Sequence, residues 1–472
     1  MPLTIEDIAT FCKKKGFVYQ DSEIYGSLAG FWDFGPLGVE LKNNIKNNWW
    51  SYFIHSHEEI VGIDGSIITH PRIWEASGHV SSFIDIAAKC RKCGYKTKLD
   101  KDELKTAKCP KCGSTYVEQG KFNIMFATNV GPVEKESIKA YLRPETAQLI
   151  FADLKLVQEN ARLKLPFGIG QIGKVFRNEI SPRDFLYRSR EFEQMELQYF
   201  IDPKKADDCP HYDKIKNYKL SILAAGAKKE ASLTIAQMLS KKIFKNKWHA
   251  YWLYNSYQWF LQLGINKNNL RLREHRKDEL AHYANAAIDI EFNFSNGWKE
   301  IFGSHDRGQF DLQEHEKHSK KDMKIYDEET KQKILPQVIE SSFGLDRAFL
   351  VILLNAYNDD KKRGNVVLNL SPGLAPVKIA VLPLVSNKPQ LTQFAEKVCS
   401  SLKKYYNCSF DKSGSIGRRY ARNDEIGTPY CITIDFDSLK KKDVTIRDRN
   451  TTKQIRVKTK DLLENLCKLL TQ

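Results

Sequence analysis

The pattern of hydrophobic and polar positions divides the chain into two parts near residue 374. Beyond that point VKIAVLPLV is typical of a buried strand, LTQFAEKVCSSLKKYY of an amphipathic helix, and KDLLENLCKLL of a closing helix. The runs YCITIDF, DVTIRDR and QIRVK are typical of further strands. Because strands that alternate with helices indicate an α/β domain, residues 375–472 are predicted to form one. Pro372, Gly373 and Pro376 mark the boundary.

The first part begins with two predicted helices. Residues 1–17 form the first, with Thr4 as its N-cap. The second follows a Gly-Pro turn and is amphipathic, with one side formed by Val39, Leu41, Ile45 and Trp49. The strand-like run IVGIDGSIITH and Pro71 come next.

Residues 203–280 are rich in lysine and lack the alternation of a strand, so we expect a helical insertion there. Trp248, Trp252 and Trp259 stand near helical spacing within it. An aromatic stripe of this kind is more often core than a platform for nucleic acid, although the basic surroundings keep both interpretations open.

A hairpin is predicted over 175–200, where two strand-like runs surround the basic turn SPRDFLYRSR. Alternation puts Arg177 and Glu179 on one face of the first run, and Phe192, Gln194 and Glu196 on one face of the second. Arginine can hold phosphate oxygens, a carboxylate can accept from an adenine amino group, and an aromatic ring can stack on a base. The hairpin therefore suits a nucleotide, and a solvated, salt-bridged hairpin is the alternative.

Four cysteines have the spacing of a zinc ribbon. Cys90 and Cys93 form one C-x2-C pair, Cys109 and Cys112 form another, and a glycine follows each pair. Four thiolates leave no open position on Zn²⁺, so the metal is expected to be structural, within an insertion over 88–115. Four unrelated cysteines are the alternative.

Composition adds weaker constraints. The chain is 42% hydrophobic and 28% charged, which is ordinary for a globular protein, and its formal net charge is +16. This charge favours a polyanionic partner such as RNA, although a basic proteome would give the same number. The N-terminus lacks a signal-peptide core, no apolar run is long enough to span a bilayer, and six of the cysteines are scattered; we therefore expect a cytoplasmic protein.

The run FRNEISPR…YRSREFEQME resembles motif 2 of the class II aminoacyl-tRNA synthetases, and in particular that of the homodimeric glycyl-tRNA synthetase family. The hexamer RPETAQ resembles the glycine-binding signature of that family, and ESSFGLDR resembles motif 3. The order helix, strand, Pro71 resembles motif 1, which forms the dimer interface in the family. GSIGRRYARNDEIGTP is similar to the glycyl version of the anticodon-binding domain, which implies that Arg418, Arg419, Arg422 and Asn423 face RNA.

This resemblance implies an α+β fold: a class II antiparallel sheet flanked by helices over 1–374, with the two insertions, followed by the α/β anticodon-binding domain. It implies a glycine–tRNA ligase that uses ATP and Mg²⁺, carries structural Zn²⁺, forms a homodimer and binds tRNA-Gly, with no membrane or DNA partner expected. It assigns the catalytic charge stabilisation to Arg177, Arg188 and Arg347. A synthetase-like protein without catalysis and a class II synthetase of different specificity remain the alternatives.

The resemblance also implies the ligand contacts. ATP is expected to bind at Arg177, Asn178, Glu179, Tyr187, Arg188, Ser189, Arg190, Glu191, Phe192, Glu300, Ile301, Gly344, Leu345, Asp346 and Arg347. Glycine is expected to bind at Glu145, Phe192, Glu193, Gln194, Met195, Glu196, Glu340, Ser341, Ser342, Phe343 and Gly344. Glu300 is a candidate ligand for Mg²⁺, and Arg307 is a candidate for the same cleft. Taken alone, Glu145 could equally be a carboxylate in the first turn of a helix.

Overall fold

The computed structural model describes residues 3–99, 103–182 and 184–470. Its centre is a nine-stranded sheet in the order β13-β12-β14-β15-β16-β19-β11-β10-β3. Neighbouring strands are antiparallel, except that β3 pairs with β10 and β12 with β14 in parallel. The strands are β3 Ile60–Ile63, β10 Phe167–Phe176, β11 Glu191–Ile201, β12 Lys219–Leu223, β13 Ala231–Thr234, β14 Leu270–Glu274, β15 Ala286–Phe294, β16 Gly297–Gly308 and β19 Gln337–Gly344. The predicted α+β class is confirmed.

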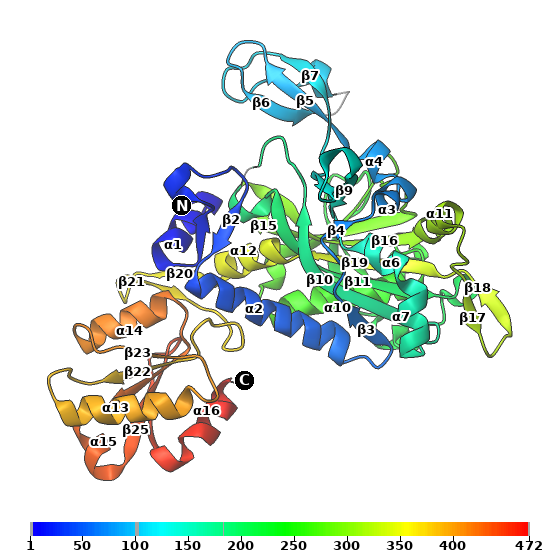
Figure 1. The fold of residues 1–472 in the computed structure, drawn as a ribbon. Coiled ribbons are helices and arrows are strands. Elements are labelled where there is room, and N and C mark those ends of the chain that lie inside the picture. The colour runs from blue at the N-terminus through cyan, green and yellow to red at the C-terminus, as the bar shows by residue number, and fades with distance from the viewer. Residues whose placement is uncertain (1–2, 100–102, 183, 471–472) are drawn as a thin grey trace.

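Helices cover both faces of this sheet (Figure 1). One face packs on α1 Ile5–Lys15, α2 Pro36–Trp50, α10 Lys247–Gln262 and α12 Leu345–Ala356, which together form the largest core. On the other face α6 Ala147–Ala152, α7 Leu154–Ala161 and α11 Phe310–Ser319 form a second, smaller core. Alternation along β11 sends Met195, Leu197 and Tyr199 into the first core and Phe200 into the second.

The N-terminal helices agree with the hydrophobic pattern in most positions. Thr4 caps α1 through a capping box with Asp7. Leu41, Ile45 and Trp49 of α2 are fully buried, but Val39 is 41% exposed, so its predicted place on the buried side was wrong. Residues two apart on a helix differ by about 200° in direction, which puts Val39 opposite Leu41.

The purely helical insertion over 203–280 is not confirmed. The segment contains α8 Tyr212–Ile215, α9 Ile235–Ser240 and α10, but β12, β13 and β14 also lie in it and belong to the central sheet. These strands have four or five residues each, too few for their alternation to stand out in the sequence. Trp248, Trp252 and Trp259 are buried, which supports their interpretation as core.

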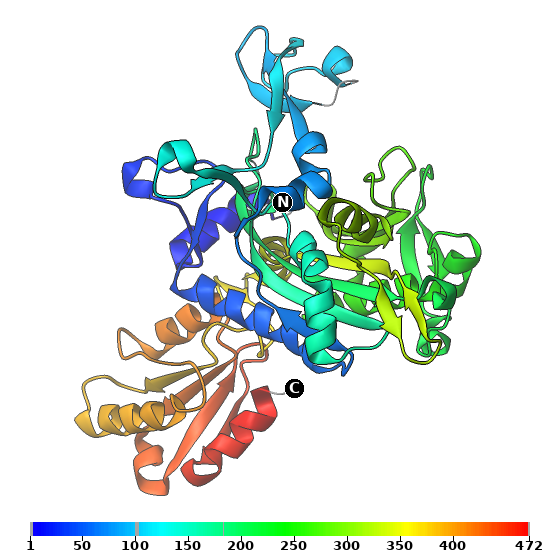
Figure 2. The same ribbon diagram turned by 45° about the vertical axis from the view of Figure 1, so that its right-hand side comes forward.

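Two small sheets extend the fold near the predicted ribbon. The first has the order β6-β5-β7, with β5 Ile84–Cys90, β6 Lys96–Leu99 and β7 Tyr116–Asn123, and it projects from the main body in both views (Figure 2). The second has the order β4-β9-β8, with β4 Ile68–Thr69, β8 Ala127–Val130 and β9 Ile138–Leu142. The short helices α3 Pro71–Ala76, α4 His79–Ser82 and α5 Glu103–Thr106 accompany them.

The C-terminal part has its own sheet and core. Its strand order is β23-β22-β24-β25-β26, with β22 Ile379–Pro383, β23 Cys408–Phe410, β24 Tyr430–Ile434, β25 Asp443–Asp448 and β26 Gln454–Lys458. The helices are α13 Pro389–Leu402, α14 Ile416–Glu425, α15 Phe436–Lys441 and α16 Leu462–Leu470. The alternation of strands and helices predicted from the sequence is confirmed. Among the described residues, no helix is long and apolar enough to cross a membrane.

Helix α14 presents fewer basic groups to solvent than predicted. Arg419 is buried and donates to the carbonyl oxygens of Pro383 and Leu384, and Asn423 is buried and donates to the carbonyl of Arg419. The expectation that these two face RNA was therefore wrong, because helical periodicity turns them inward. Arg418 and Arg422 remain accessible.

The short pairs β1 Val18–Gln20 with β2 Trp32–Phe34, β17 Ile325–Asp327 with β18 Gln332–Ile334, and β20 Tyr357–Asp360 with β21 Asn365–Leu368 complete the strands.

Trp259 ties α10 to α2 and to the sheet. Its ring lies edge-on to Phe343 at 5.1 Å between centroids, and its indole nitrogen donates to Asn48 Oδ1 at 2.8 Å. We expect Trp259→Ala to lower the free energy of unfolding by about 3–5 kcal/mol, because it leaves a cavity and an unpaired amide oxygen. Urea unfolding followed by circular dichroism measures this. Trp298→Ala, at a half-buried position, is the control; an equal loss in both variants would contradict the packing argument.

Candidate active site

The predicted hairpin is present, but its first strand is shorter than expected. The last pair of β10 and β11 joins Phe176 to Glu191, so Arg177, Asn178 and Glu179 lie beyond β10 and alternation does not govern them. A tight turn replaces the strand, in which the Glu179 amide donates to the Arg177 carbonyl at 2.7 Å. Arg177 and Glu179 nevertheless line the same cleft.

This cleft has a volume of about 1040 Å³ and opens at the β10–β11 turn, beside the start of α12. Most of the residues predicted to bind ATP line it. The predicted ATP-binding residues that line the cleft are Arg177, Glu179, Tyr187, Arg188, Ser189, Phe192, Glu300, Gly344, Asp346 and Arg347. Gln194 and Ser342 of the predicted glycine site also line it, as do Ser82, Phe83, Ile124, Leu186 and residues 278–281.

The guanidinium groups of the cleft are held by neighbouring carboxylates and rings. Arg188 pairs with Glu179 at 2.8 Å, and Arg347 pairs with Glu300 at 2.8 Å. Arg347 also lies 4.6 Å from the centre of the Tyr187 ring. A cation in the first turn of α12 opposes the helix dipole, and this carboxylate and ring compensate for it.

Arg177 is held differently. Its Nε donates to the Pro144 carbonyl at 2.9 Å, and its guanidinium lies over the rings of Phe83 and Phe192 at 5.4 and 5.5 Å. No carboxylate forms an ion pair with Arg177 in the part of the chain that the structure describes. Its positive charge therefore remains available to an anion in the cleft.

The structure does not bring every predicted residue into this cleft. Alternation within β11, β16 and β19 turns Met195, Ile301, Ser341 and Phe343 toward the core face, and Leu345 is buried at the start of α12. Glu193 lies on that face too, where Lys42 and Lys46 of α2 each approach its carboxylate to 3.0 Å.

The remaining predicted ATP residues support the hairpin. The backbone N–H of Asn178 donates to the Ile124 carbonyl at 2.7 Å. The side chain of Arg190 donates to the Glu179 carbonyl at 3.0 Å, and Glu191 forms an ion pair with Lys174. Arg183, in the basic turn SPRDFLYRSR, lies outside the described residues.

Next to the cleft, three carboxylates are buried together. Glu196 on β11 and Glu340 on β19 are 2% and 3% exposed, and Glu145, just before α6, is 6% exposed. The register pairs Gln198 with Glu340 and Glu196 with Ser342. Gln198 Nε2 donates to Glu196 Oε1 at 3.0 Å and to Glu340 Oε1 at 2.9 Å, so one amide joins two carboxylates.

Two of these carboxylates have basic side chains as partners. Glu340 accepts from Arg307 Nη1 at 2.9 Å and lies 2.7 Å from His305 Nδ1. Glu145 lies 3.3 Å from His79 Nε2. Burial by itself would raise the pKa of Glu145, but the charge and hydrogen bond of His79, with Arg307, outweigh it and lower the pKa to about 2.

Glu196 is the exception. Its partners are the Thr146 hydroxyl and the Gln198 amide, and no ion pair to it occurs among the residues described. Burial and the nearby Glu340 charge raise the pKa of Glu196 well above its ordinary value. The cluster therefore favours a small cation that hydrogen-bonds to carboxylates, such as an ammonium group.

Sequence reasoning missed most of the groups that hold the cluster. His79, Thr146, Gln148, His305 and Asp311 were not predicted, and Arg307 was only a candidate. Arg307 lies between Glu340 and Asp311, and its guanidinium is 3.7 Å from the centre of the Tyr283 ring. Thr146 and Gln148 lie within the RPETAQ hexamer, which could have pointed to them. His79, His305, Arg307 and Asp311 come from segments far from Glu145 in the sequence, so no local spacing identifies them.

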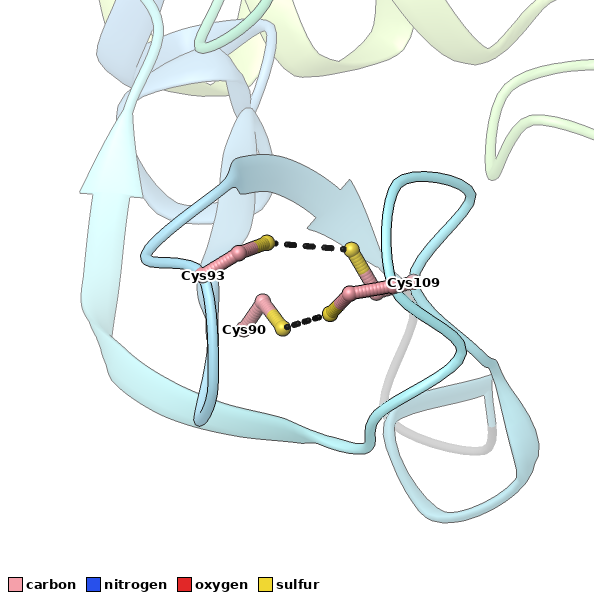
Figure 3. A group of neighbouring side chains, drawn as sticks. Cys90, Cys93 and Cys109 are labelled. Atoms are coloured by element: carbon pink, nitrogen blue, oxygen red, sulfur yellow. Dashed lines mark hydrogen bonds between the residues drawn. The ribbon is translucent and has the colours of Figure 1, made fainter.

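The four cysteine sulfurs of the predicted ribbon lie within 4.8 Å of one another. Cys90 Sγ is 3.4 Å from Cys112 Sγ, and Cys93 Sγ is 3.5 Å from Cys109 Sγ; Figure 3 shows Cys90, Cys93 and Cys109 pointing toward a common centre. Four thiolates bonded to zinc at about 2.3 Å would lie at similar separations. Gly94 and Gly113, with φ of 72° and 70°, close the two turns. The donor set thus fits zinc.

Comparison with known proteins gives concordant relatives. The glycine–tRNA ligase of Ruminiclostridium cellulolyticum is 45% identical over 97% of this chain and 97% of its own length. Those of Acetivibrio thermocellus and Borrelia hermsii are 44% and 43% identical, each over 98% of this chain and over 97% and 96% of their own lengths. Residues 378–469 match the family described as Anticodon binding domain.

We expect Cys109→Ser to lose bound zinc and to loosen the ribbon, because three thiolates hold the ion less well than four. Metal analysis of the purified protein should fall from about one zinc per chain to a small fraction of that. Cys467→Ser, an exposed cysteine outside the quartet, is the control. Unchanged zinc in Cys109→Ser would show that the quartet is not the site.

Proposed function

The chain belongs to the glycine–tRNA ligase family, and from this premise we propose how its residues carry out the reaction. It is an aminoacyl-tRNA ligase. It activates glycine with ATP to glycyl-adenylate and pyrophosphate, and then transfers the glycyl group to the 3′-terminal adenosine of tRNA-Gly. The observation that carries the residue assignment is the juxtaposition of an arginine-lined cleft with a buried carboxylate cluster that lacks one cation.

ATP occupies the cleft. Arg177 holds the α-phosphate, since its charge has no carboxylate partner, while Phe192 stacks on the adenine. Arg188 takes the outer phosphates and Glu179 the adenine amino group, so nucleotide binding separates this ion pair. Arg347 lies over the adenine near the γ-phosphate.

Glycine occupies the carboxylate cluster with its ammonium toward Glu196, between Glu145 and Glu340. Ser342 forms the wall where the cluster meets the cleft. Every other amino acid is larger, and a side chain in a packed, hydrogen-bonded pocket costs about 1–3 kcal/mol from overpacking. Exclusion by size therefore gives specificity without a separate editing reaction.

The first step needs no side chain as nucleophile. A carboxylate oxygen of glycine attacks the α-phosphorus, the bond from that phosphorus to the bridging oxygen breaks, and pyrophosphate leaves. A ribose hydroxyl of the tRNA then attacks the glycyl carbonyl carbon, the bond from that carbon to the phosphate oxygen breaks, and AMP leaves as its phosphate takes up the hydroxyl proton. Arg177, Arg188 and Arg347 stabilise the charge that develops, and positioning supplies the remainder.

Two metal ions belong to this proposal. Glu300 offers a half-exposed carboxylate at the cleft, an oxygen ligand of the kind that Mg²⁺ prefers, and Mg²⁺ when bound would offset phosphate charge. Zn²⁺ at Cys90, Cys93, Cys109 and Cys112 would be structural, because all four positions are filled by thiolates.

The proposed assembly is a homodimer. Exposed apolar side chains gather on the loop that follows β1 and on the β8–β9 hairpin, and they include Ile24, Tyr25, Val130, Val133 and Ile138. Exposed apolar side chains that gather on neighbouring elements are typical of a protein contact. The scattered cysteines, none of them disulfide-bonded, support a reducing, cytoplasmic location.

The function is tested by ATP–pyrophosphate exchange with each of the twenty amino acids. Exchange with glycine alone is expected. Exchange with another amino acid would favour a class II synthetase of different specificity, and no exchange by folded protein would favour a non-catalytic RNA-binding role.

Glu145→Gln should weaken glycine activation about 10- to 100-fold, because it replaces a charged partner of the ammonium with a neutral one. ATP binding should change little, since Glu145 is separate from the cleft lining. The KM for glycine in pyrophosphate exchange and the Kd for ATP measure the two effects. Glu159→Gln on α7, an exposed carboxylate, is the control. An equal loss of ATP affinity would refute the assignment.

Arg177→Ala should lower the rate of adenylate formation by about 10²–10³-fold, because it removes one charged donor from the α-phosphate. The unfolding curve should stay close to that of the unmodified protein, as the side chain contributes one hydrogen bond to Pro144 and two ring contacts at the open cleft. Pyrophosphate exchange at saturating glycine and ATP is the measurement, with exposed Arg162→Ala as the control. Retained exchange in Arg177→Ala would remove Arg177 from the reaction.

A further inference from the structure

The segment that joins the two domains is held along its length by side chains. Arg449 donates to the Leu370 carbonyl at 2.6 Å, and Lys378 donates to the carbonyls of Pro372 and Gly373. Asn44 on α2 donates to the carbonyls of Leu374 and Ala375, at 3.1 Å each. Asn407 donates to the Pro376 carbonyl at 2.8 Å. A segment whose carbonyls are bound from both sides does not act as a free hinge.

A second tie crosses between the domains at the turn of the β20–β21 hairpin, which lies against α14 (Figure 1). Arg363, in this turn, donates through Nη1 to the Arg449 carbonyl and through Nη2 to the Asn450 carbonyl, both at 2.7 Å. Its Nη1 also lies 3.3 Å from Asp424 at the end of α14. Asp360 of the same hairpin pairs with Arg363 Nε at 3.1 Å and so orients the guanidinium.

The contact is close as well as polar. Gly427, just after α14, has a φ of +82°, and a side chain there would meet Leu370 Cδ1 at 2.8 Å. Lys15 at the end of α1 forms another ion pair across the interface, with Glu425. The C-terminal end of α14 is therefore bound to the catalytic part at several points, while Arg418 and Arg422 lie on its accessible surface.

We propose that Arg363 is a positioning residue for tRNA charging: it fixes α14 relative to the active-site cleft, so that a tRNA held by the anticodon-binding domain reaches the cleft with its 3′ end. The inference rests on the proposed function. It concerns full-length tRNA only, because the binding of a substrate that does not reach the C-terminal domain does not depend on where that domain lies.

Removing Arg363 should spare the fold of the C-terminal domain. Asp424 keeps its bidentate pair with Arg447, at 2.7 and 2.8 Å, so no buried carboxylate is left without a cation. The carbonyls of Arg449 and Asn450 lose one donor each at the domain boundary, where water can replace it. Loss of the Arg363 side chain therefore changes how the two domains are held together and leaves the fold of each unchanged.

The test compares Arg363→Ala with Lys361→Ala, which removes the same charge from the same turn but pairs only within the hairpin, with Asp359. Each protein is assayed for glycine-dependent pyrophosphate exchange, for charging of full-length tRNA-Gly, and for charging of a minihelix that contains only the acceptor stem. We expect Arg363→Ala to raise the KM for full-length tRNA about tenfold, the size of one charge-assisted hydrogen bond. Exchange and minihelix charging should be unchanged, and Lys361→Ala should behave as the unmodified protein.

A loss that affects the minihelix as much as full-length tRNA, or no loss at all, would overturn the positioning role. Arg363→Lys retains the positive charge but loses the several guanidinium donors. Its KM for full-length tRNA should lie between those of Arg363→Ala and the unmodified protein. If Arg363→Ala does not fold, Asn44→Ala on α2 removes a different contact between the domains, the one to the joining segment. It should likewise raise the KM for full-length tRNA and leave charging of the minihelix unchanged. Failure of the unmodified protein to exchange pyrophosphate would instead refute the proposed function.

Discussion

The structure depends on the burial of three carboxylates, two on one face of the adjacent strands β11 and β19 and the third just before α6. A buried charge is costly unless it is paired and hydrogen-bonded, and here Arg307, His305 and His79 compensate two of the three. The third, Glu196, has hydroxyl and amide partners only. The fold thus buries one carboxylate of the cluster without a cationic partner among the described residues, and the register of β11 against β19 sets its distance from Glu340.

A close-packed aromatic core lies on the opposite face of the same strands. Phe343 of β19 lies against Trp49, Phe53, Trp259 and Phe260, so α2 and α10 pack directly behind the residues that carry Glu340 and Ser342. Glu193 is anchored there by Lys42 and Lys46. A site built on strands with a close-packed core behind them holds its ligands with little reorganisation, which is what catalysis by positioning requires.

The cleft and the domain interface use arginine in different ways. In the cleft Arg188 and Arg347 are paired with the carboxylates of Glu179 and Glu300, which line the same cleft. At the interface Arg363 and Arg449 donate to backbone carbonyls, which nothing in the reaction replaces. The first arrangement suits a ligand that enters and leaves, and the second suits a permanent connection.

Much of the fold and the cleft could be predicted from the sequence. Hydrophobic alternation identified the C-terminal α/β part, the capped first helix and the two strands of the hairpin, because these depend on contacts between near neighbours. Resemblance of short motifs identified Arg177, Glu179, Arg188 and Arg347, which the structure brings to one cleft. The cysteine spacing identified a quartet that the structure brings together.

What failed in the sequence interpretation has a common physical cause. The strands β12, β13 and β14 are too short for a period to show, and they join the sheet because β15 offers them an edge. Arg419 and Asn423 have the composition of an RNA-binding helix, yet the packing of α14 on its sheet turns them inward.

The sequence by itself determined the domain order, the arginines that line the cleft and the four cysteines that lie together, since each depends on a local motif or spacing. Only the tertiary structure decided which face of β11 and β19 carries the buried carboxylates, that His79, His305 and Arg307 lie against them, and that Arg363 contacts the C-terminal domain. Those properties depend on strand register and on contacts between distant segments, which no local pattern encodes.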